Sequence, residues 1–225
     1  LYEMITNQFS FALEIDGKIQ SMTRDQLSGY FQNPSPEVRA NAYREFYRVY
    51  AENSTVLAQI YLHRARDWHT EGVQLRGFSS PIAAQNVMVD LPDEAVETLL
   101  SVCRKNAGLF QRYFKLKASW LGVDKLRRYD IYAPVARSKK NYEFDTAANM
   151  VLDSFAAFDP KVAELAKRVF DENRLDSEIR KGKRGGAFCW GFLPEETPFV
   201  LVNYQGTGRE VATLAHELGH GVHQV

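Results

Sequence analysis

Apolar and polar positions alternate near the start of the chain, in the stretch FSFALEIDGKIQSM. Such alternation is typical of β-strands that bury one face, and an Asp-Gly pair between two alternating runs favours a tight hairpin turn. We therefore expect strands near 9–15 and 18–22, joined at Asp16-Gly17. The pattern then becomes helical, and Thr23 is suited to cap a short helix that ends near Asn33.

Prolines mark the starts of several predicted helices in the next part of the chain. Ser35-Pro36 has an N-cap residue followed by a first-turn proline, and helix formers dominate from there to about Gly72. Ser80-Pro81 begins a short helix, and Pro92-Asp93 begins a long one that reaches about Leu121. Apolar residues recur at helical spacing in the first of these segments, namely Ala42, Phe46, Val49, Tyr50, Val56, Leu57, Ile60 and Tyr61.

The middle of the chain contains a connector and two further helices. The stretch RRYDIYAPVARSKK, residues 127–140, is irregular and contains a proline. Helices are expected near 145–158 and 160–173, with Asp159-Pro160 marking the start of the second. Up to this point the pattern is therefore mostly helical.

The character of the sequence changes after Arg180, where glycine and aromatic residues become frequent. GGAFCWGF (185–192) and PFVLVNY (198–204) are interpreted as two short strands joined by a proline-bounded loop. The second strand leads into the segment from Thr207 to Glu210, which has the spacing of a capping box before an apolar periodic run. The last element is therefore predicted to be a helix from about 208 to the end of the sequence.

This last predicted helix contains the sequence HELGH. At about 100° of rotation per residue, His216 and His220 differ by about 40° around the axis and by one turn along it. They lie opposite an apolar stripe, and Glu217 lies between the stripe and the histidines. The stripe consists of Val211, Leu214, Ala215, Leu218 and Val222. This arrangement suits a zinc hydrolase, with the histidines as metal ligands and the adjacent carboxylate as general base.

A motif this short also arises by chance, and a helix with two exposed histidines and a glutamate is unremarkable. The metal site is favoured because the histidines face away from the apolar stripe and a strand directly precedes the helix. Gly219 and Gly221 also stand where a helix prefers alanine, which indicates close approach of another element. His223, three residues past His220, is interpreted as a substrate-facing group or as an ordinary polar residue.

The remaining histidine and basic residues form no second metal or phosphate site. His63 and His69 lie about 120° apart on one helix, so we expect both at the surface or at the edge of the core. The basic run at 180–184 lacks a phosphate-loop motif and is interpreted as a solvated loop. The functional alternative is an entrance that attracts acidic peptide termini. The basic residues are Arg180, Lys181, Lys183 and Arg184.

The composition argues against several classes of function. Lys and Arg together number 28, as do Asp and Glu, so a net charge of zero gives no electrostatic case for a nucleic-acid or membrane partner. No apolar run approaches the roughly 18 residues of a membrane span. Cys103 and Cys189 match no zinc or redox spacing, so we expect two free thiols in a reducing compartment.

The stretch KGKRGGAFCWGF, together with PFVLVNYQGTGREVATLAHELGHGVHQV, resembles the oligoendopeptidase F branch of the thimet-oligopeptidase family of zinc peptidases. The GKR-GAF, VNYQGT and LAHELGHGVH segments carry the resemblance. It implies a mainly α protein, with long antiparallel helices and a small β element before a zincin-type HExxH helix. By match to the family motif, His216 and His220 carry over as zinc ligands and Glu217 as the catalytic base.

The resemblance also implies a cytoplasmic enzyme that cleaves short unstructured peptides. We expect the substrate to add as a strand to an exposed edge of GGAFCWGF or PFVLVNY. Gly186, Ala187 and Phe188 are the candidate contacts, with His223 as a further one.

In that family the third zinc ligand is a glutamate on a later helix, so residues 1–225 are expected to be an internal piece that is inactive alone. We divide it into a helical region with the β-hairpin, 1–130, and an incomplete catalytic region, 131–225. Two other functions stay open. One is a non-catalytic helical peptide-binding or scaffold module, and the other is a zinc hydrolase of non-peptide amides.

Overall fold

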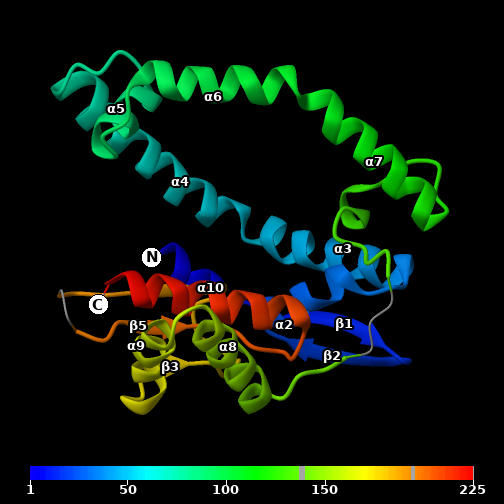
Figure 1. Ribbon diagram of the computed structural model, residues 1–225. Coiled ribbons are helices and arrows are strands. Elements are labelled where there is room, and N and C mark those ends of the chain that lie inside the picture. Colours follow the sequence, from blue (N-terminus) through cyan, green and yellow to red (C-terminus); the bar gives the residue numbers. More distant parts are fainter. Residues whose placement is uncertain (137–139, 194–195, 225) are drawn as a thin grey trace.

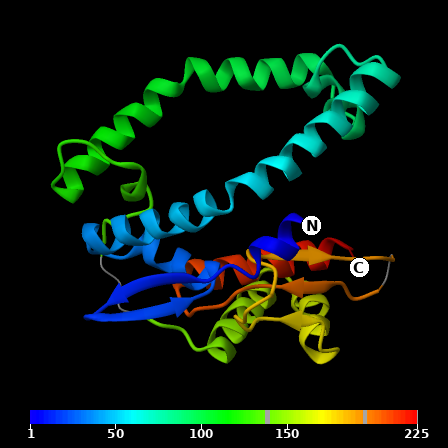
Figure 2. The same ribbon diagram turned by 180° about the vertical axis from the view of Figure 1, so that it is seen from behind.

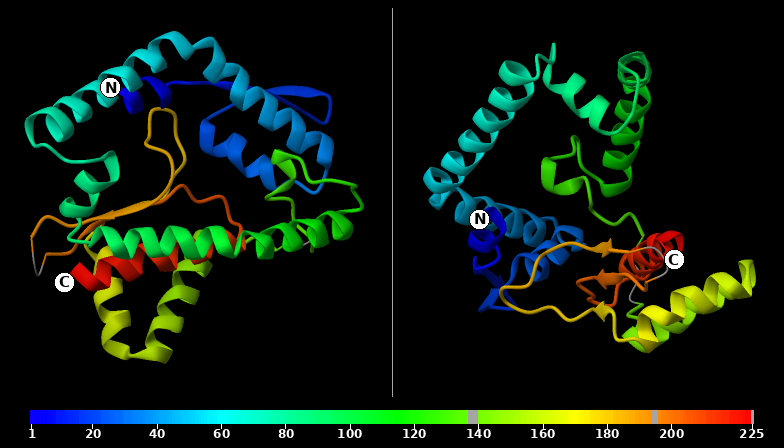
Figure 3. Two further views of the ribbon diagram at one scale, coloured as in Figure 1. Left: turned by 90° about the horizontal axis from the view of Figure 1, so that it is seen from above. Right: turned by 90° about the vertical axis from the view of Figure 1, so that its left-hand side faces the viewer.

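The computed structural model describes residues 1–136, 140–193 and 196–224 and is mainly α, as the sequence predicts. Figures 1 and 2 show a body that contains both ends of the chain, and an arch of long helices that projects from it. In the right-hand view of Figure 3 the arch rises above the body.

The N-terminal part of the body is a β-hairpin. β1 (Phe11–Ile15) and β2 (Lys18–Met22) pair antiparallel, close to the predicted bounds. Both residues of the Asp16-Gly17 turn have positive φ, which is why an Asp-Gly pair suits this position. A helix that the sequence pattern did not predict, α1 (Tyr2–Thr6), precedes the hairpin; at five residues it is too short to show a period.

Two predicted caps begin the helices that cover the hairpin. Thr23 caps α2 (Arg24–Gly29), which continues into the 3-10 turn η1 (Tyr30–Gln32), and Ser35 caps α3 (Pro36–Glu52). The side chains of α2, α3 and the hairpin form one apolar core. Its buried members are Phe11, Leu13, Met22, Leu27, Ala42 and Val49.

The arch consists of a series of helices joined end to end. These are α4 (Ser54–Trp68), the π-helical turn η2 (His69–Leu75), α5 (Pro81–Met88), α6 (Asp93–Lys105) and α7 (Ala107–Leu121). The start of α5 after Ser80 is as predicted. The predicted apolar stripe is only partly buried, because Val56 and Tyr61 on α4 are exposed.

Two segments that the sequence predicts as continuous helices are each divided by an asparagine. Asn53 separates α3 from α4, and Asn106 separates α6 from α7. At each break the asparagine amide donates to the carbonyl four residues earlier, that of Val49 at 2.9 Å and that of Val102 at 2.8 Å. A side chain that bonds the local backbone competes with helix continuation, so both interruptions have the same cause.

A buried ion pair fastens the returning end of the arch to α3. Arg39 donates to Asp130 Oδ1 at 2.7 Å, and the two side chains are 2% and 5% exposed. Asp130 ends the 3-10 turn η3 (Arg128–Asp130), and Arg39 also donates to two backbone carbonyls at 2.7 and 3.0 Å. The connector predicted as irregular is therefore anchored at its start; its residues 137–139 lie outside the described chain.

The second part of the body combines helices with a three-stranded sheet. Its strands are β3 (Leu175–Asp176), β4 (Phe188–Trp190) and β5 (Phe199–Leu201). Their order is β3-β5-β4, with β4 antiparallel to β5 and β3 parallel to it. The two predicted strands are confirmed, and they pair with each other. Their loop includes Pro194 and Glu195, which are outside the described residues. β3 was not predicted, because two residues give no pattern. The helices of this part are α8 (Phe144–Phe158), α9 (Pro160–Asp171) and α10 (Gly208–Gln224).

The last helix, α10, is held by its apolar stripe. Leu214 and Leu218 have no exposed surface and pack against α8, α9 and the sheet. Burial of a leucine side chain stabilises by about 1.5–3 kcal/mol, so the stripe fixes the rotation of α10 about its axis. The other buried members of this core are Val151, Ala166, Val169, Val200 and Val202.

None of the helices in the described ranges is both long enough and apolar enough to cross a membrane. The division of the chain at residues 130 and 131 stays a prediction.

Candidate active site

Local signals set the start of α10. Gly206, with a φ of +91°, allows the chain to turn from β5 into the helix. The Thr207 backbone N–H donates to Glu210 Oε2 at 2.9 Å, and the Glu210 N–H donates to Thr207 Oγ1 at 3.4 Å. The predicted capping box is therefore present, and it begins the helix that contains HELGH.

The two histidines of HELGH converge on one point. Their Nε2 atoms, in His216 and His220, lie 3.1 Å apart, and both side chains are exposed. Two nitrogens bound at about 2.0–2.1 Å to a tetrahedral zinc ion lie about 3.3 Å apart, so the pair fits two ligand positions. The distance also fits a hydrogen bond between the rings. Across the described ranges, no cluster of three or more His, Cys, Asp or Glu side chains suits a metal ion.

Glu217 lies beside these histidines but inside the protein, at 7% exposed. The pKa of the Cys189 thiol on β4 is raised mainly by burial and secondly by the negative charge of Glu217. α10, which carries Glu217, packs against β4. The order predicted around the helix, from apolar stripe to carboxylate to histidines, is the order that the structure has.

The two glycines of the motif have different surroundings. A Cβ at Gly221 would meet Pro198, Cys189 and Val169 at 3.4–3.9 Å, so α9 and the sheet lie beside this glycine at distances that a small side chain would also tolerate. At Gly219 a side chain would meet nothing within 4 Å among the described residues. Other elements therefore lie beside Gly221, as predicted, although not closely enough to require glycine, and the prediction is wrong at Gly219.

β4 is an outer strand of the sheet whereas β5 is central, so among the described residues β4 has the unpaired edge that strand addition requires. Gly186 and Ala187 lead into β4, and Phe188 is its first residue. Asn203 Nδ2 donates to the carbonyls of Arg184 and Gly186, at 3.1 and 2.8 Å. The approach to the edge is therefore fixed by a side chain from the segment after β5.

The prediction of a solvated basic loop is wrong at Lys183, whereas Arg180, Lys181 and Arg184 are exposed as expected. The Lys183 side chain is 2% exposed, and its ammonium donates to Asp176 Oδ1 and to the carbonyls of Asp176, Glu178 and Val202, at 2.6–3.1 Å. Arg180 stays exposed and also pairs with Asp176, at 2.7 Å. The hydrogen bonds from Arg180 and then Lys183 lower the pKa of Asp176 to about 2. Lys183 therefore ties the segment before β4 to β3 and to the end of β5.

The remaining predicted histidines have simpler positions. His63 and His69 are exposed, as expected. His223 is exposed on α10, and its role as a substrate contact stays a prediction. Cys103 and Cys189 are both free thiols, as expected.

Comparison with known proteins identifies the family. Peptidase family M3 matches residues 30–225. The chain belongs to peptidase family M3. Group B oligopeptidase PepB of Streptococcus agalactiae serotype III (strain NEM316) is 30% identical, over 99% of this chain and 37% of the relative. The chromosomal oligoendopeptidase F of Lactococcus lactis subsp. cremoris is 28% identical, over 93% of this chain and 34% of the relative.

These matches confirm the predicted oligoendopeptidase F branch of the family. The chain spans little more than a third of the length of these curated relatives.

Solved structures share the fold. A crystal structure of an assigned oligoendopeptidase F from Bacillus anthracis str. Ames has a TM-score of 0.83 at 22% identity, covering 98% of this chain and 41% of that one. A structure of PZ peptidase A with an inhibitor has the same TM-score at 19% identity, covering 98% and 40%. The mainly α fold class predicted from the sequence is therefore confirmed.

Proposed function

We propose that the protein is a zinc-dependent oligoendopeptidase that hydrolyses short unstructured peptides. The observation that carries this proposal is the 3.1 Å separation of the His216 and His220 Nε2 atoms, with the buried carboxylate of Glu217 beside them. Membership of peptidase family M3 supports peptide-bond hydrolysis as the reaction.

Each residue of HELGH has a separate role in this mechanism. His216 and His220 would hold the zinc ion through Nε2. When bound, zinc polarises the scissile carbonyl and makes water a stronger nucleophile near neutral pH. Glu217 accepts the proton of the attacking water and then donates it to the leaving amine.

The substrate lies along the free edge of β4. An extended peptide that adds to this edge gains main-chain hydrogen bonds, which do not depend on its side chains. This favours unstructured peptides, because a folded protein rarely offers a free extended segment. Substrate contacts at Gly186, Ala187, Phe188 and His223 stay predictions from strand and helix placement, and a cytoplasmic location stays a prediction from the family resemblance.

The metal site is tested by comparing two alanine variants, one at the proposed ligand His216 and one at His223, which is not a proposed ligand. We expect His216→Ala in the full-length protein to weaken zinc binding by more than about 100-fold, because a direct ligand is lost. Peptide cleavage is lost with it. His223→Ala, on the same helix, should retain zinc. Zinc content after dialysis and cleavage of a quenched fluorescent peptide, with and without chelator, measure both effects.

Equal zinc content in the two variants would contradict the metal site. Full-length protein that binds peptides without chelator-sensitive cleavage would instead support the scaffold function, and cleavage restricted to non-peptide amides would support the other hydrolase.

Residues 1–225 alone are expected to lack peptidase activity, even with zinc supplied. Catalytic zinc normally takes three protein ligands, whereas the described residues bring only two histidines together. Assay of the purified fragment on the same fluorescent peptide measures this. Chelator-sensitive turnover near that of the full-length protein would contradict it.

A further inference from the structure

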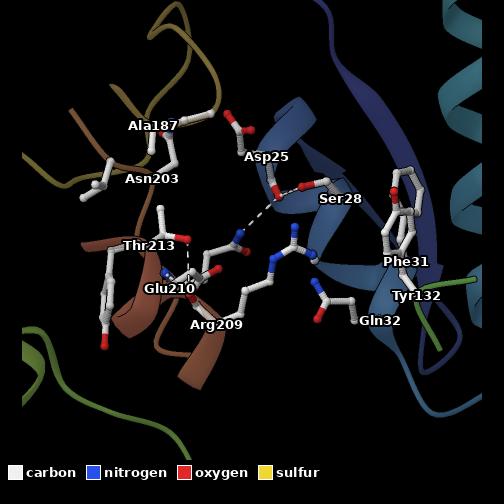
Figure 4. A pocket seen from close by; sticks show the side chains of 15 residues that line it. Asp25, Ser28, Phe31, Gln32, Tyr132, Ala187, Asn203, Arg209, Glu210 and Thr213 are labelled. Atoms are coloured by element: carbon white, nitrogen blue, oxygen red, sulfur yellow. Dashed lines mark hydrogen bonds between the residues drawn. The ribbon is translucent and has the colours of Figure 1, made fainter. Parts of the chain in front are cut away.

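A cavity of about 310 Å³ lies between the N-terminal half of α10, α2 and the segment that leads into β4. Figure 4 shows its walls: Arg209 and Thr213 come from α10, Asp25 and Ser28 from α2, and Ala187 from the approach to the edge strand. Thr213 is only one turn before His216, so the cavity continues the surface that carries the histidines toward the start of the helix.

Hydrogen bonds hold these walls in place. The side-chain amide of Gln205 donates to the Asp25 carbonyl at 3.1 Å and joins the segment before α10 to α2. A side chain at Gly29 would lie 3.2 Å from Gln205 Oε1, so the two segments are in close contact. At the wall formed by the approach to β4, Asn203 Nδ2 donates to the Gly186 carbonyl at 2.8 Å. The cavity is therefore formed before any ligand enters, which lowers the entropic cost of binding.

The charged groups of the cavity differ in what they already contact. Glu210 accepts hydrogen bonds from the backbone N–H groups of Gln205 and Thr207, at 2.8 and 2.9 Å. The Asp25 carboxylate points at the approach to β4, where a side chain at Gly185 would lie 2.8 Å from it. Arg209 instead extends from α10 across the cavity toward Ser28 and Gln32, as Figure 4 shows.

No ion pair or side-chain hydrogen bond among the described residues engages the Arg209 guanidinium. It is therefore available to a ligand. A guanidinium binds a carboxylate through two parallel N–H donors, which makes an anionic group of this shape the natural partner.

The position of the cavity sets which part of a peptide reaches it. Gly186 and Ala187 precede β4, so a peptide that adds antiparallel to β4 has its C-terminal side there. Arg209 and His216 are seven residues apart, or about 10 Å along the helix. An extended peptide covers that distance in about three residues, at roughly 3.4 Å each.

We propose that this cavity is a subsite for a carboxylate of the substrate, bound by Arg209 about three residues beyond the scissile bond on its C-terminal side. The carboxylate is either the free C-terminus of the peptide or an acidic side chain at that position. This inference rests on the proposed function, because the scissile bond must lie at His216 and His220.

Matched peptides and one substitution test it in the full-length protein. Three peptides share one cleavage site: one ends in a free carboxylate three residues beyond it, one ends there in an amide, and one has glutamate there followed by an amidated extension. Binding is measured by calorimetry in the Glu217→Gln background, which prevents turnover, and kcat/KM is measured with Glu217 present.

We expect Arg209→Gln to weaken binding of the carboxylate peptide by about tenfold or more and to leave the amide peptide unchanged, because only the charge-assisted bond is lost. The glutamate peptide shows which source of carboxylate the subsite takes. Arg44→Gln removes the same charge from an exposed position on α3 and should leave the binding and kcat/KM of all three peptides unchanged. Circular dichroism checks that each variant is folded.

Different outcomes would contradict the carboxylate subsite and the proposed function. If peptides are cleaved but Arg209→Gln affects acid and amide peptides equally, the subsite is wrong and the proposed function stands. If the wild-type protein neither binds nor cleaves any of them, both fail.

Discussion

Replacing Glu217 with glutamine is expected to lower turnover by about 10²–10⁴-fold while zinc stays bound, since this is the range for loss of a general base. Glutamine keeps the shape of the side chain but cannot accept the proton of the attacking water. His216 and His220, whose Nε2 atoms lie 3.1 Å apart, are unchanged by the substitution. Peptide cleavage by the full-length variant, with zinc content measured on the same sample, tests the expectation.

A matched control removes one carboxylate elsewhere. Glu164 is exposed on α9, so Glu164→Gln should retain full activity. If Glu217→Gln kept more than about one per cent of wild-type activity, another residue would have to take the proton, and the role given to Glu217 would be wrong.

Replacing Asp130 with asparagine is expected to lower the free energy of unfolding by about 3–5 kcal/mol, because Arg39 would be left buried without its counter-charge. The two side chains are 2% and 5% exposed and join α3 to the returning end of the arch. The Arg127 N–H donates to Asp130 Oδ2 at 3.0 Å, and the side-chain oxygen of asparagine can still accept this hydrogen bond. Urea denaturation followed by circular dichroism measures the change.

An exposed ion pair provides the comparison. Arg48 and Glu52 lie 2.6 Å apart but are 50% and 60% exposed, so Glu52→Gln should cost less than about 1 kcal/mol. Adding Arg39→Met to Asp130→Asn should restore part of the loss, since the uncompensated charge is removed. A cost for Asp130→Asn no larger than that of Glu52→Gln would show that water reaches the buried pair.

The sequence predicts those parts of the fold that depend on residues close together in the chain. The capping box at Thr207 and Glu210, and the apolar period through Leu214 and Leu218, fix both the start and the rotation of α10. The convergence of the HELGH histidines is a property of a single helix, so spacing alone is enough to predict it.

Features that depend on distant segments could not be predicted in this way. Lys183 belongs to a basic, glycine-rich run typical of a solvated loop, yet the carbonyl of Val202, 19 residues later, helps to bury its ammonium. The cavity at Arg209 requires α2, which lies about 180 residues earlier in the chain. At Asn53 and Asn106 the signal is local but weak, because asparagine is tolerated within helices and divides them only when its amide turns back on the backbone.

The shortness of β4 has a consequence for selectivity and for solubility. An open edge is a template for any extended chain, including another copy of the same protein, and short edge strands reduce that hazard. β4 is three residues long, with Gly186 and Gly191 near its two ends. A strand of this length offers few main-chain hydrogen bonds, so it holds a passing chain weakly. If substrates bind at this edge as proposed, the choice among peptides is made by groups beyond its ends. The same small number of hydrogen bonds limits self-association.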